Sequence, residues 1–349
     1  MPASRDHRYD GPQIFLVLLA LVGFVALVGG VSHLDDAPGR HDRPPVPVPS
    51  GPVPTSPSLP GAVAGDAAPP ALPESTPAAT TAADAVRGDS LPGGRDRVFA
   101  GNQVLVAYYG TAGSGALGVL GEARPEKIVP RLVRAAAPFG RGGRPVQPVF
   151  ELIVTVAHAG PTKTGSYSAN IPRAQVQRYI DAAHRHGALV VLDLQPGRAH
   201  FLDVARSWEW ALRDPWVGLA LDPEWRMGPN GVPGRRIGSV SAAEVNRVSA
   251  WLDDLTARND LPEKVFMLHQ FRTDMVRNIE RVRDRDHLAL VQHVDGFGTP
   301  GEKMATFRRV IRPRQFALGF KLFYDEDVHR MRPAQVLAIR PRVSFVSFQ

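Results

Sequence analysis

The segment VGLALDPEW, residues 217–225, brings two carboxyl groups together at the end of an apolar run. Asp222 and Glu224 are two residues apart, with Pro223 between them and Trp225 directly after. Alternate residues of a β-strand point to the same face, so the spacing predicts that both carboxyl groups face the same way. Two adjacent carboxyl groups raise each other's proton affinity, which makes one of them a candidate acid catalyst.

Other apolar runs of the chain also end in polar or titratable side chains. The residues at these ends are Asp193 and Gln195, His269 and Gln270, His293 and Asp295, and Lys321, Tyr324 and Asp325. A single acid after a strand commonly caps the next helix. Several acids that met at one rim would repel each other unless they shared protons, cations or a substrate. Their convergence would therefore mark a functional site.

The elements that must position these residues alternate between strands and helices from about residue 98 onward. Apolar runs predict strands at 103–110, 149–157, 188–195, 217–225, 264–271, 288–298, 316–324 and 343–349. Amphipathic patterns predict helices near 125–138, 172–187, 201–213, 241–260, 273–286, 301–311 and 331–338. Eight strands separated by seven helices favour a (β/α)8 TIM barrel over the alternative, a doubly wound open sheet. The usual final helix is missing, or residues 96–102 replace it.

The active site of such a barrel lies at the carboxyl ends of the strands. Alternation along the strand places the small side chains of Gly218 and Ala220 inside the barrel, and Leu219 and Leu221 against the helices. The two acids that follow then project into the mouth of the barrel.

Aromatic side chains near the same rim would suit a carbohydrate, because sugar rings stack on aromatic faces while their hydroxyl groups bind to acids. These residues are Tyr108, Tyr109, Tyr167, Trp225 and Tyr324. The alternative is that they only cover the end of the barrel. Arg198 and Arg226 follow two acidic strand ends, where they could pair with the acids or bind an anionic group of the substrate. Further candidate substrate-binding residues are Gln195, His269, Gln270, His293 and Lys321.

The segment VGLALDPEW, residues 217–225, resembles the fourth-strand motif of the family 18 glycoside hydrolases, Asp-Gly-x-Asp-x-Asp-x-Glu. The matching residues are Gly218, Asp222 and Glu224. The family 25 lysozymes carry a similar Asp-x-Glu on a barrel strand. Val217 and Ala220 stand where the family 18 motif has its first two Asp residues. The resemblance implies a glycoside hydrolase in which Glu224 is the acid and Asp222 steadies the substrate.

Glycoside hydrolysis also needs a nucleophile or base, unless the substrate's own acetamido group participates. Asp193 and Asp295 are the first candidates, and Glu151, which lies early in its strand, is the last. The alternative function, from another class, is a catalytically inactive barrel that binds wall glycan or a protein.

No cofactor or metal is expected from the sequence. GSGALG, residues 113–118, fits a dinucleotide-binding glycine pattern but does not open a helix directly, so it is typical of a barrel loop. His158, His269, His293 and Asp295 could bind a metal, yet the chain has no His-x-His or His-Glu-x-x-His spacing. A serine hydrolase is disfavoured, because no Gly-x-Ser-x-Gly element is present.

The N-terminal region predicts a location in the cell envelope. Residues 14–31 form an uncharged apolar run after Arg5 and Arg8. This pattern predicts a transmembrane signal anchor at 13–34, with residues 1–12 in the cytoplasm. The alternative is a cleaved secretion signal, and both place the rest of the chain outside the cytoplasm.

The composition separates a linker from the barrel and limits the partners. Residues 35–95 hold 14 of the 33 prolines and no aromatic residue, which predicts a disordered linker before a barrel domain at 96–349. The net charge of +7 arises from 36 Arg and 5 Lys, which form no basic block. Codon usage therefore explains the charge better than a nucleic-acid-binding function does. Cysteine is absent, which excludes disulfides and thiolate chemistry. The expected partner is a polysaccharide or peptidoglycan-type substrate, and the oligomeric state stays open.

Overall fold

The structure, a computed structural model, describes residues 90–349, so the predicted signal anchor and nearly all of the predicted linker lie outside the described residues. Eight parallel strands form a closed barrel, in which the first strand pairs with both the second and the last. Their bounds are β1 (Val104–Thr111), β2 (Val146–Ala157), β4 (Leu189–Leu194), β5 (Val217–Leu221), β7 (Lys264–His269), β9 (Leu288–Val294), β10 (Ala317–Leu322) and β11 (Val343–Phe348). The predicted TIM barrel is confirmed, and all eight strands lie where the sequence predicts them.

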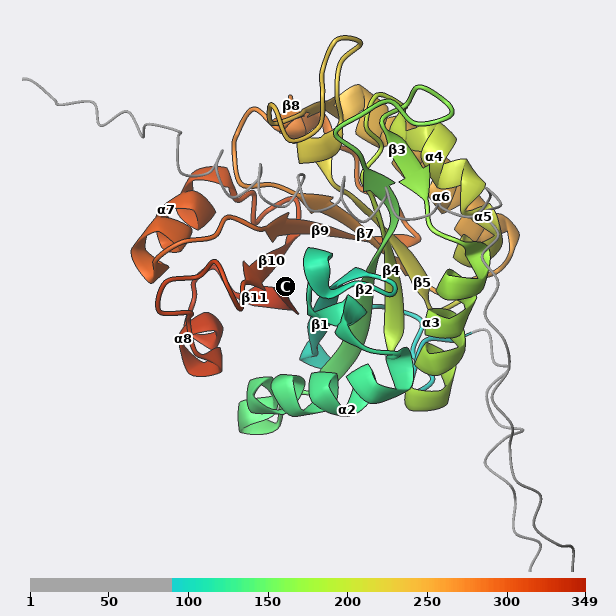
Figure 1. Cartoon of the computed structure of the whole chain (residues 1–349). Coiled ribbons are helices and arrows are strands. Elements are labelled where there is room, and N and C mark those ends of the chain that lie inside the picture. The colour runs from blue at the N-terminus through green and yellow to red at the C-terminus, as the bar shows by residue number, and fades with distance from the viewer. Residues whose placement is uncertain (1–89) are drawn as a thin grey trace, which may run out of the picture. The chain divides into compact units, whose positions relative to one another are not determined.

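Helices surround the barrel, as Figure 1 shows. They are α2 (Pro125–Ala136), α3 (Arg173–His186), α4 (Phe201–Ser207), α5 (Glu209–Leu212), α6 (Ala242–Arg258), α7 (Pro300–Val310) and α8 (Pro333–Leu337). Local signals set their ends: the Ser241 hydroxyl accepts a hydrogen bond from the Glu244 N–H at the start of α6, and Gly187 ends α3 with a φ of 65°. Within residues 90–349, no helix combines the length and apolar character needed to cross a membrane.

The helix predicted at 273–286 is wrong. The connection between β7 and β9 instead contains β8 (Val276–Arg277), which pairs with β6 (Val240–Ser241), and a short 3-10 turn, Ile279–Arg281. Its apolar residues recur at helical spacing, but Asn278 adopts a left-handed φ of 56° that breaks the helix. The apolar side chains pack under a loop rather than along a helix.

Small side chains allow the strands to close. Ala220 lies in the interior cluster of the barrel, whereas Leu219 and Leu221 belong to the outer core beneath the helices, as predicted. A Cβ atom on Gly218 would lie 2.6 Å from the backbone oxygen of Val265 on the neighbouring strand β7. Only glycine fits at that position without displacing the strand.

The segment before β1 covers the amino end of the barrel. Leu91 and Val98 are buried among the interior side chains. The Val98 N–H donates to Glu263 Oε2 at 2.7 Å, and Trp216 Nε1 donates to the Ser90 carbonyl at 2.9 Å. Residues 90–102 therefore close the end opposite to the predicted site.

Candidate functional site

Titratable side chains from five strands meet inside the carboxyl end of the barrel. We call them the buried cluster: Glu151, Asp193, Asp222, His269, His293 and Asp295, with exposed fractions of 0, 0, 3, 0, 0 and 9%. Strand alternation places them there, because they continue the inward-facing rows of β2, β4, β5, β7 and β9. The convergence predicted from the strand ends is therefore present in the fold.

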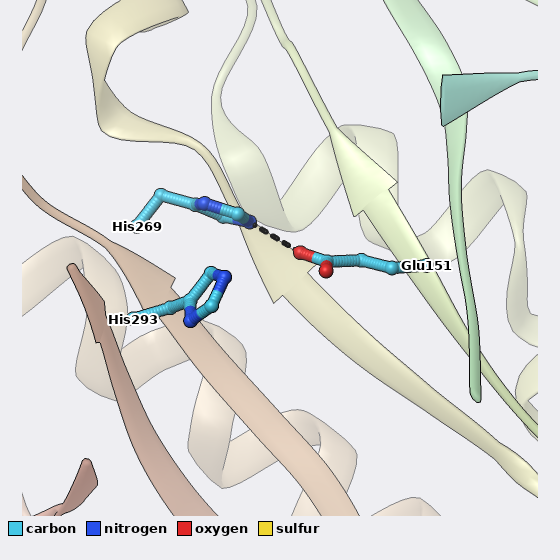
Figure 2. Close-up of side chains that lie close together, drawn as sticks. All are labelled: Glu151, His269 and His293. Carbon is cyan, nitrogen blue, oxygen red and sulfur yellow. Dashed lines mark ion pairs between the residues drawn. The ribbon is translucent and has the colours of Figure 1, made fainter. Parts of the chain in front are cut away.

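His269 lies at the centre of the buried cluster and contacts three carboxylates. Its Nδ1 is 2.9 Å from Asp295 Oδ2, and its Nε2 is 2.9 Å from Glu151 Oε1 and 3.9 Å from Asp193 Oδ1. Figure 2 shows the side chains of His269 and Glu151 reaching toward each other, with the ring of His293 beside them. Burial favours the neutral ring, but the hydrogen bond to Asp295 and the nearby carboxylates of Glu151 and Asp193 outweigh it and raise the pKa of His269 well above its ordinary value.

Several atoms of the buried cluster have no hydrogen-bond partner among residues 90–349. They are both carboxylate oxygens of Glu151, Asp193 Oδ1, His269 Nε2, His293 Nδ1 and Asp295 Oδ1. The contact between His269 and Glu151 is thus a close approach of charges that lacks the alignment of a hydrogen bond. Buried polar atoms rarely lack a partner, so the unpartnered atoms mark the buried cluster as a candidate binding site.

Neighbouring polar groups hold the rest of the buried cluster in place. The Tyr109 hydroxyl donates to Asp193 Oδ2 at 2.9 Å, and Lys321 Nζ lies 3.3 Å from the centre of the Tyr109 ring. Ser347 Oγ is 2.7 Å from His293 Nε2. Burial raises the pKa of Asp193 to about 6.

Glu224 lies at the edge of this site, in a short 3-10 turn, Pro223–Trp225. Strand β5 ends at Leu221 and Asp222 is still extended, but Glu224 lies in the turn, so the strand alternation predicted from the sequence does not extend to Glu224. The turn nevertheless keeps Glu224 near the buried cluster. Burial, followed by the charges of Asp222 and Asp295, raises the pKa of Glu224 well above its ordinary value. Both effects favour the protonated form of this half-buried carboxyl group.

Neither of the two predicted rim arginines contacts the buried cluster. Arg226 Nε lies 3.0 Å from Glu244 Oε1, in an ion pair between the β5 connection and helix α6. Arg198 donates to the Gly231 carbonyl at 2.8 Å and lies over the Tyr167 ring, 3.8 Å from its centre. Arg226 therefore fastens the β5 connection to α6, and Arg198 fastens one loop to another; within residues 90–349 no arginine forms an ion pair with the acids in the mouth.

Of the other predicted residues, some lie apart from the buried cluster. Tyr108 packs in the outer core and donates to the Arg131 carbonyl at 3.2 Å. Tyr324 is 37% exposed and stacks on Phe348, with ring centres 5.5 Å apart.

The two predicted amides hold the framework of the barrel, and the predicted indole lies in the turn that carries Glu224. Gln195 Oε1 accepts the Ala157 N–H at 3.1 Å, and Gln270 Oε1 accepts Gln292 Nε2 at 2.7 Å. Trp225 is half-buried in the same turn as Glu224.

Sequence reasoning missed two features of the site. It ranked Glu151 last, although Glu151 is one of the acids that contact His269, and it did not single out Ser347, which contacts His293. The signal for both was available: each residue continues an inward-facing row of its strand. What the sequence lacks is the strand register that sets their depth in the barrel.

Comparison with known proteins leaves the family of this chain open. No protein-family model matches it, and no curated protein matches it. Among solved structures, it is similar to a xylose isomerase domain protein from Planctomyces limnophilus, with 13% sequence identity and a TM-score of 0.32. The match covers 70% of this chain and 90% of that one. The assignment of the barrel rests on the strand pairings described above.

Proposed function

We propose that this chain is a glycoside hydrolase that acts on a polysaccharide of the cell envelope, with Glu224 as the acid. One observation carries the proposal: the half-buried carboxyl group of Glu224 lies in the turn that Asp222 fixes after strand β5, where burial and neighbouring carboxylates raise its pKa. Hydrolysis of a glycosidic bond requires such a proton donor beside a second carboxylate.

In this proposal Glu224 donates its proton to the glycosidic oxygen as the bond between that oxygen and the anomeric carbon breaks. Asp295 supplies the second carboxylate, as nucleophile or as base for the attacking water. It is the most exposed acid of the buried cluster, at 9%, and the contact with His269 Nδ1 fixes its orientation. Asp222 supports Glu224 by holding its turn and its charge state.

The state of the acids favours this function over the alternative, an inactive glycan-binding barrel. In an inactive barrel we would expect Arg198 or Arg226 to form ion pairs with the carboxylates of the site. Both arginines instead bind to other groups. Buried carboxylates without such partners cost stability, which a protein retains more readily where they serve chemistry.

The envelope substrate is proposed from the sequence, since a predicted anchor and a Pro-rich linker precede the barrel. The test is to incubate the full-length protein with isolated cell-wall glycan and to measure new reducing ends. Their release supports the proposal. If the protein sediments with the glycan and no new reducing ends appear, the binding function is supported instead.

A further inference from the structure

The geometry points to a metal site in the barrel interior: we propose that Glu151, His269 and His293 bind one divalent transition-metal ion of the zinc type. Each residue offers one ligand atom, and these atoms all lie within 4.8 Å of one another. All three side chains have an exposed fraction of 0%. The proposal concerns binding alone, and it holds whether or not the protein cleaves a glycan.

The Glu151 and His269 atoms that would bind the ion have no competing partner, whereas His293 has one ring nitrogen, Nε2, 2.7 Å from Ser347 Oγ and the other, Nδ1, without a partner among the described residues. Within residues 90–349, neither oxygen of the Glu151 carboxylate is hydrogen-bonded, and the same is true of His269 Nε2. Zinc bonds of about 2.0–2.1 Å in a tetrahedral site place neighbouring ligand atoms about 3.3 Å apart. The 2.9 Å between His269 Nε2 and Glu151 Oε1 needs to open by only a few tenths of an ångström.

The second ring nitrogen of His269 is oriented as in known metal sites. Metal-binding histidines commonly donate their other N–H to a carboxylate, which fixes the tautomer and aims the free nitrogen at the ion. His269 Nδ1 makes this contact with Asp295 Oδ2 at 2.9 Å. Ser347 Oγ, 2.7 Å from His293 Nε2, holds the second ring beside the Glu151 carboxylate (Figure 2).

Charge and ligand type select the kind of ion. Asp193 Oδ1 lies 3.9 Å from His269 Nε2 without a hydrogen-bond partner, so Asp193 or a water molecule can take the fourth position. A doubly charged ion would offset the two negative charges of Glu151 and Asp193, which are costly when buried alone. Two imidazoles with a carboxylate suit zinc, whereas magnesium prefers oxygen ligands and retains its waters.

A protonated His269 accounts for fewer of the unpartnered atoms in the buried cluster than a bound metal ion does. An imidazolium between Asp295 and Glu151 would account for the two contacts of 2.9 Å. It would still leave Glu151 Oε2 and Asp193 Oδ1 without partners in the barrel interior. An ion in the same place engages the carboxylates of both.

The test measures zinc binding to the full-length protein after treatment with a chelator. We expect about one zinc ion per chain, a rise in the unfolding temperature on adding zinc, and no comparable effect of magnesium. Glu151→Gln and His269→Gln should weaken zinc binding by at least about 100-fold. His184→Gln removes a histidine that pairs with Asp214 outside the buried cluster, so it should bind zinc as the wild type does.

Further outcomes distinguish the metal proposal from the proposed glycoside hydrolase function. Glu224→Gln, which removes the proposed acid, should leave zinc binding unchanged. The metal proposal is overturned if the stripped wild type takes up no zinc, or if folded Glu151→Gln and His269→Gln bind zinc as tightly as the wild type. Should both variants fail to fold, cobalt(II) added to the wild type decides: the visible spectrum of a histidine-bound, four-coordinate ion supports the site, and its absence overturns it.

Discussion

Asp222 Oδ1 accepts a hydrogen bond of 3.3 Å from the backbone N–H of Glu224, so one acid fixes the turn that carries the other. Asp222 also acts on Glu224 through its charge, which is the largest influence after burial on the raised pKa of Glu224. The residue between them, Pro223, restricts the backbone of the same turn. These two carboxyl groups therefore act as a unit at the mouth of the barrel.

Replacing Asp222 by Asn should move the pH dependence of the reaction. Asn keeps an oxygen that can accept the Glu224 N–H but removes the negative charge that raises the pKa of Glu224. In the proposed mechanism the reaction requires protonated Glu224, so activity should be lost as the pH rises through this pKa. The alkaline limb of the kcat/KM profile should therefore shift to lower pH in Asp222→Asn. An unchanged alkaline limb would show that Glu224 is not the group that titrates there.

Tyr109→Phe should destabilise the barrel. The change leaves Asp193 Oδ2 without the 2.9 Å hydrogen bond that it accepts from the Tyr109 hydroxyl, in a fully buried position. We expect the free energy of unfolding, measured in urea, to fall by about 1–3 kcal/mol. Tyr324→Phe removes a hydroxyl from a side chain that is 37% exposed and should change it by less than about 0.5 kcal/mol. Equal effects of both substitutions would argue against a special role of the buried contact.

Gly218→Ala should be severe, because the added methyl group meets backbone rather than a movable side chain. Its Cβ would lie 2.6 Å from the Val265 carbonyl oxygen. We expect a loss of about 3 kcal/mol or more in the free energy of unfolding, at the upper end of the cost of overpacking. Gly160→Ala is the matched control, since nothing lies within 4 Å of its added Cβ. A Gly218→Ala protein as stable as this control would contradict the close packing of β5 on β7.

The barrel could be predicted from the sequence because eight apolar runs are separated by mostly amphipathic segments, and the residues within a run alternate between the barrel interior and the outer core. The same alternation correctly directs Asp193 and His293 into the interior. The prediction of a helix at 273–286 failed because apolar residues at helical spacing also occur in loops that pack these residues against the core. Local periodicity does not distinguish these two cases.

The depth of each site residue could not be predicted, because depth depends on the register between strands. The sequence analysis ranks Glu151 last because it lies early in its strand, yet β2 pairs it with Tyr109 on one side and Val191 on the other. That register brings the Glu151 carboxylate to the level of His269. Register follows from packing around the whole barrel, which residue spacing within one strand does not contain.

Lys264 should make stability depend on pH in the alkaline range. Burial lowers its pKa from 10.5 to about 7, although its Nζ donates to the carbonyls of Asp214 and Val217. Between pH 7 and 10 the unfolded chain therefore binds a proton that the folded protein does not, so the free energy of unfolding gains from this group as the pH rises.

Comparison with Lys264→Met isolates this contribution, since Met fills a similar volume without titrating. The wild type should gain stability relative to Lys264→Met by up to about 1.4 kcal/mol per pH unit across this range. Urea unfolding of both proteins at several pH values measures the difference. A difference that stays constant with pH would show that Lys264 titrates normally.

The central claim, that Glu224 is the acid of a glycoside hydrolase, is tested most directly by reducing-end release from cell-wall glycan by the wild type, Glu224→Gln and Glu280→Gln. Glu280 has a side chain that is 64% exposed, so its replacement controls for the loss of one carboxylate. We predict that Glu280→Gln retains wild-type activity and that Glu224→Gln, still folded, loses about 10²–10⁴-fold. Release by Glu224→Gln at the wild-type rate, or no release by the wild type from any wall glycan, would contradict the account.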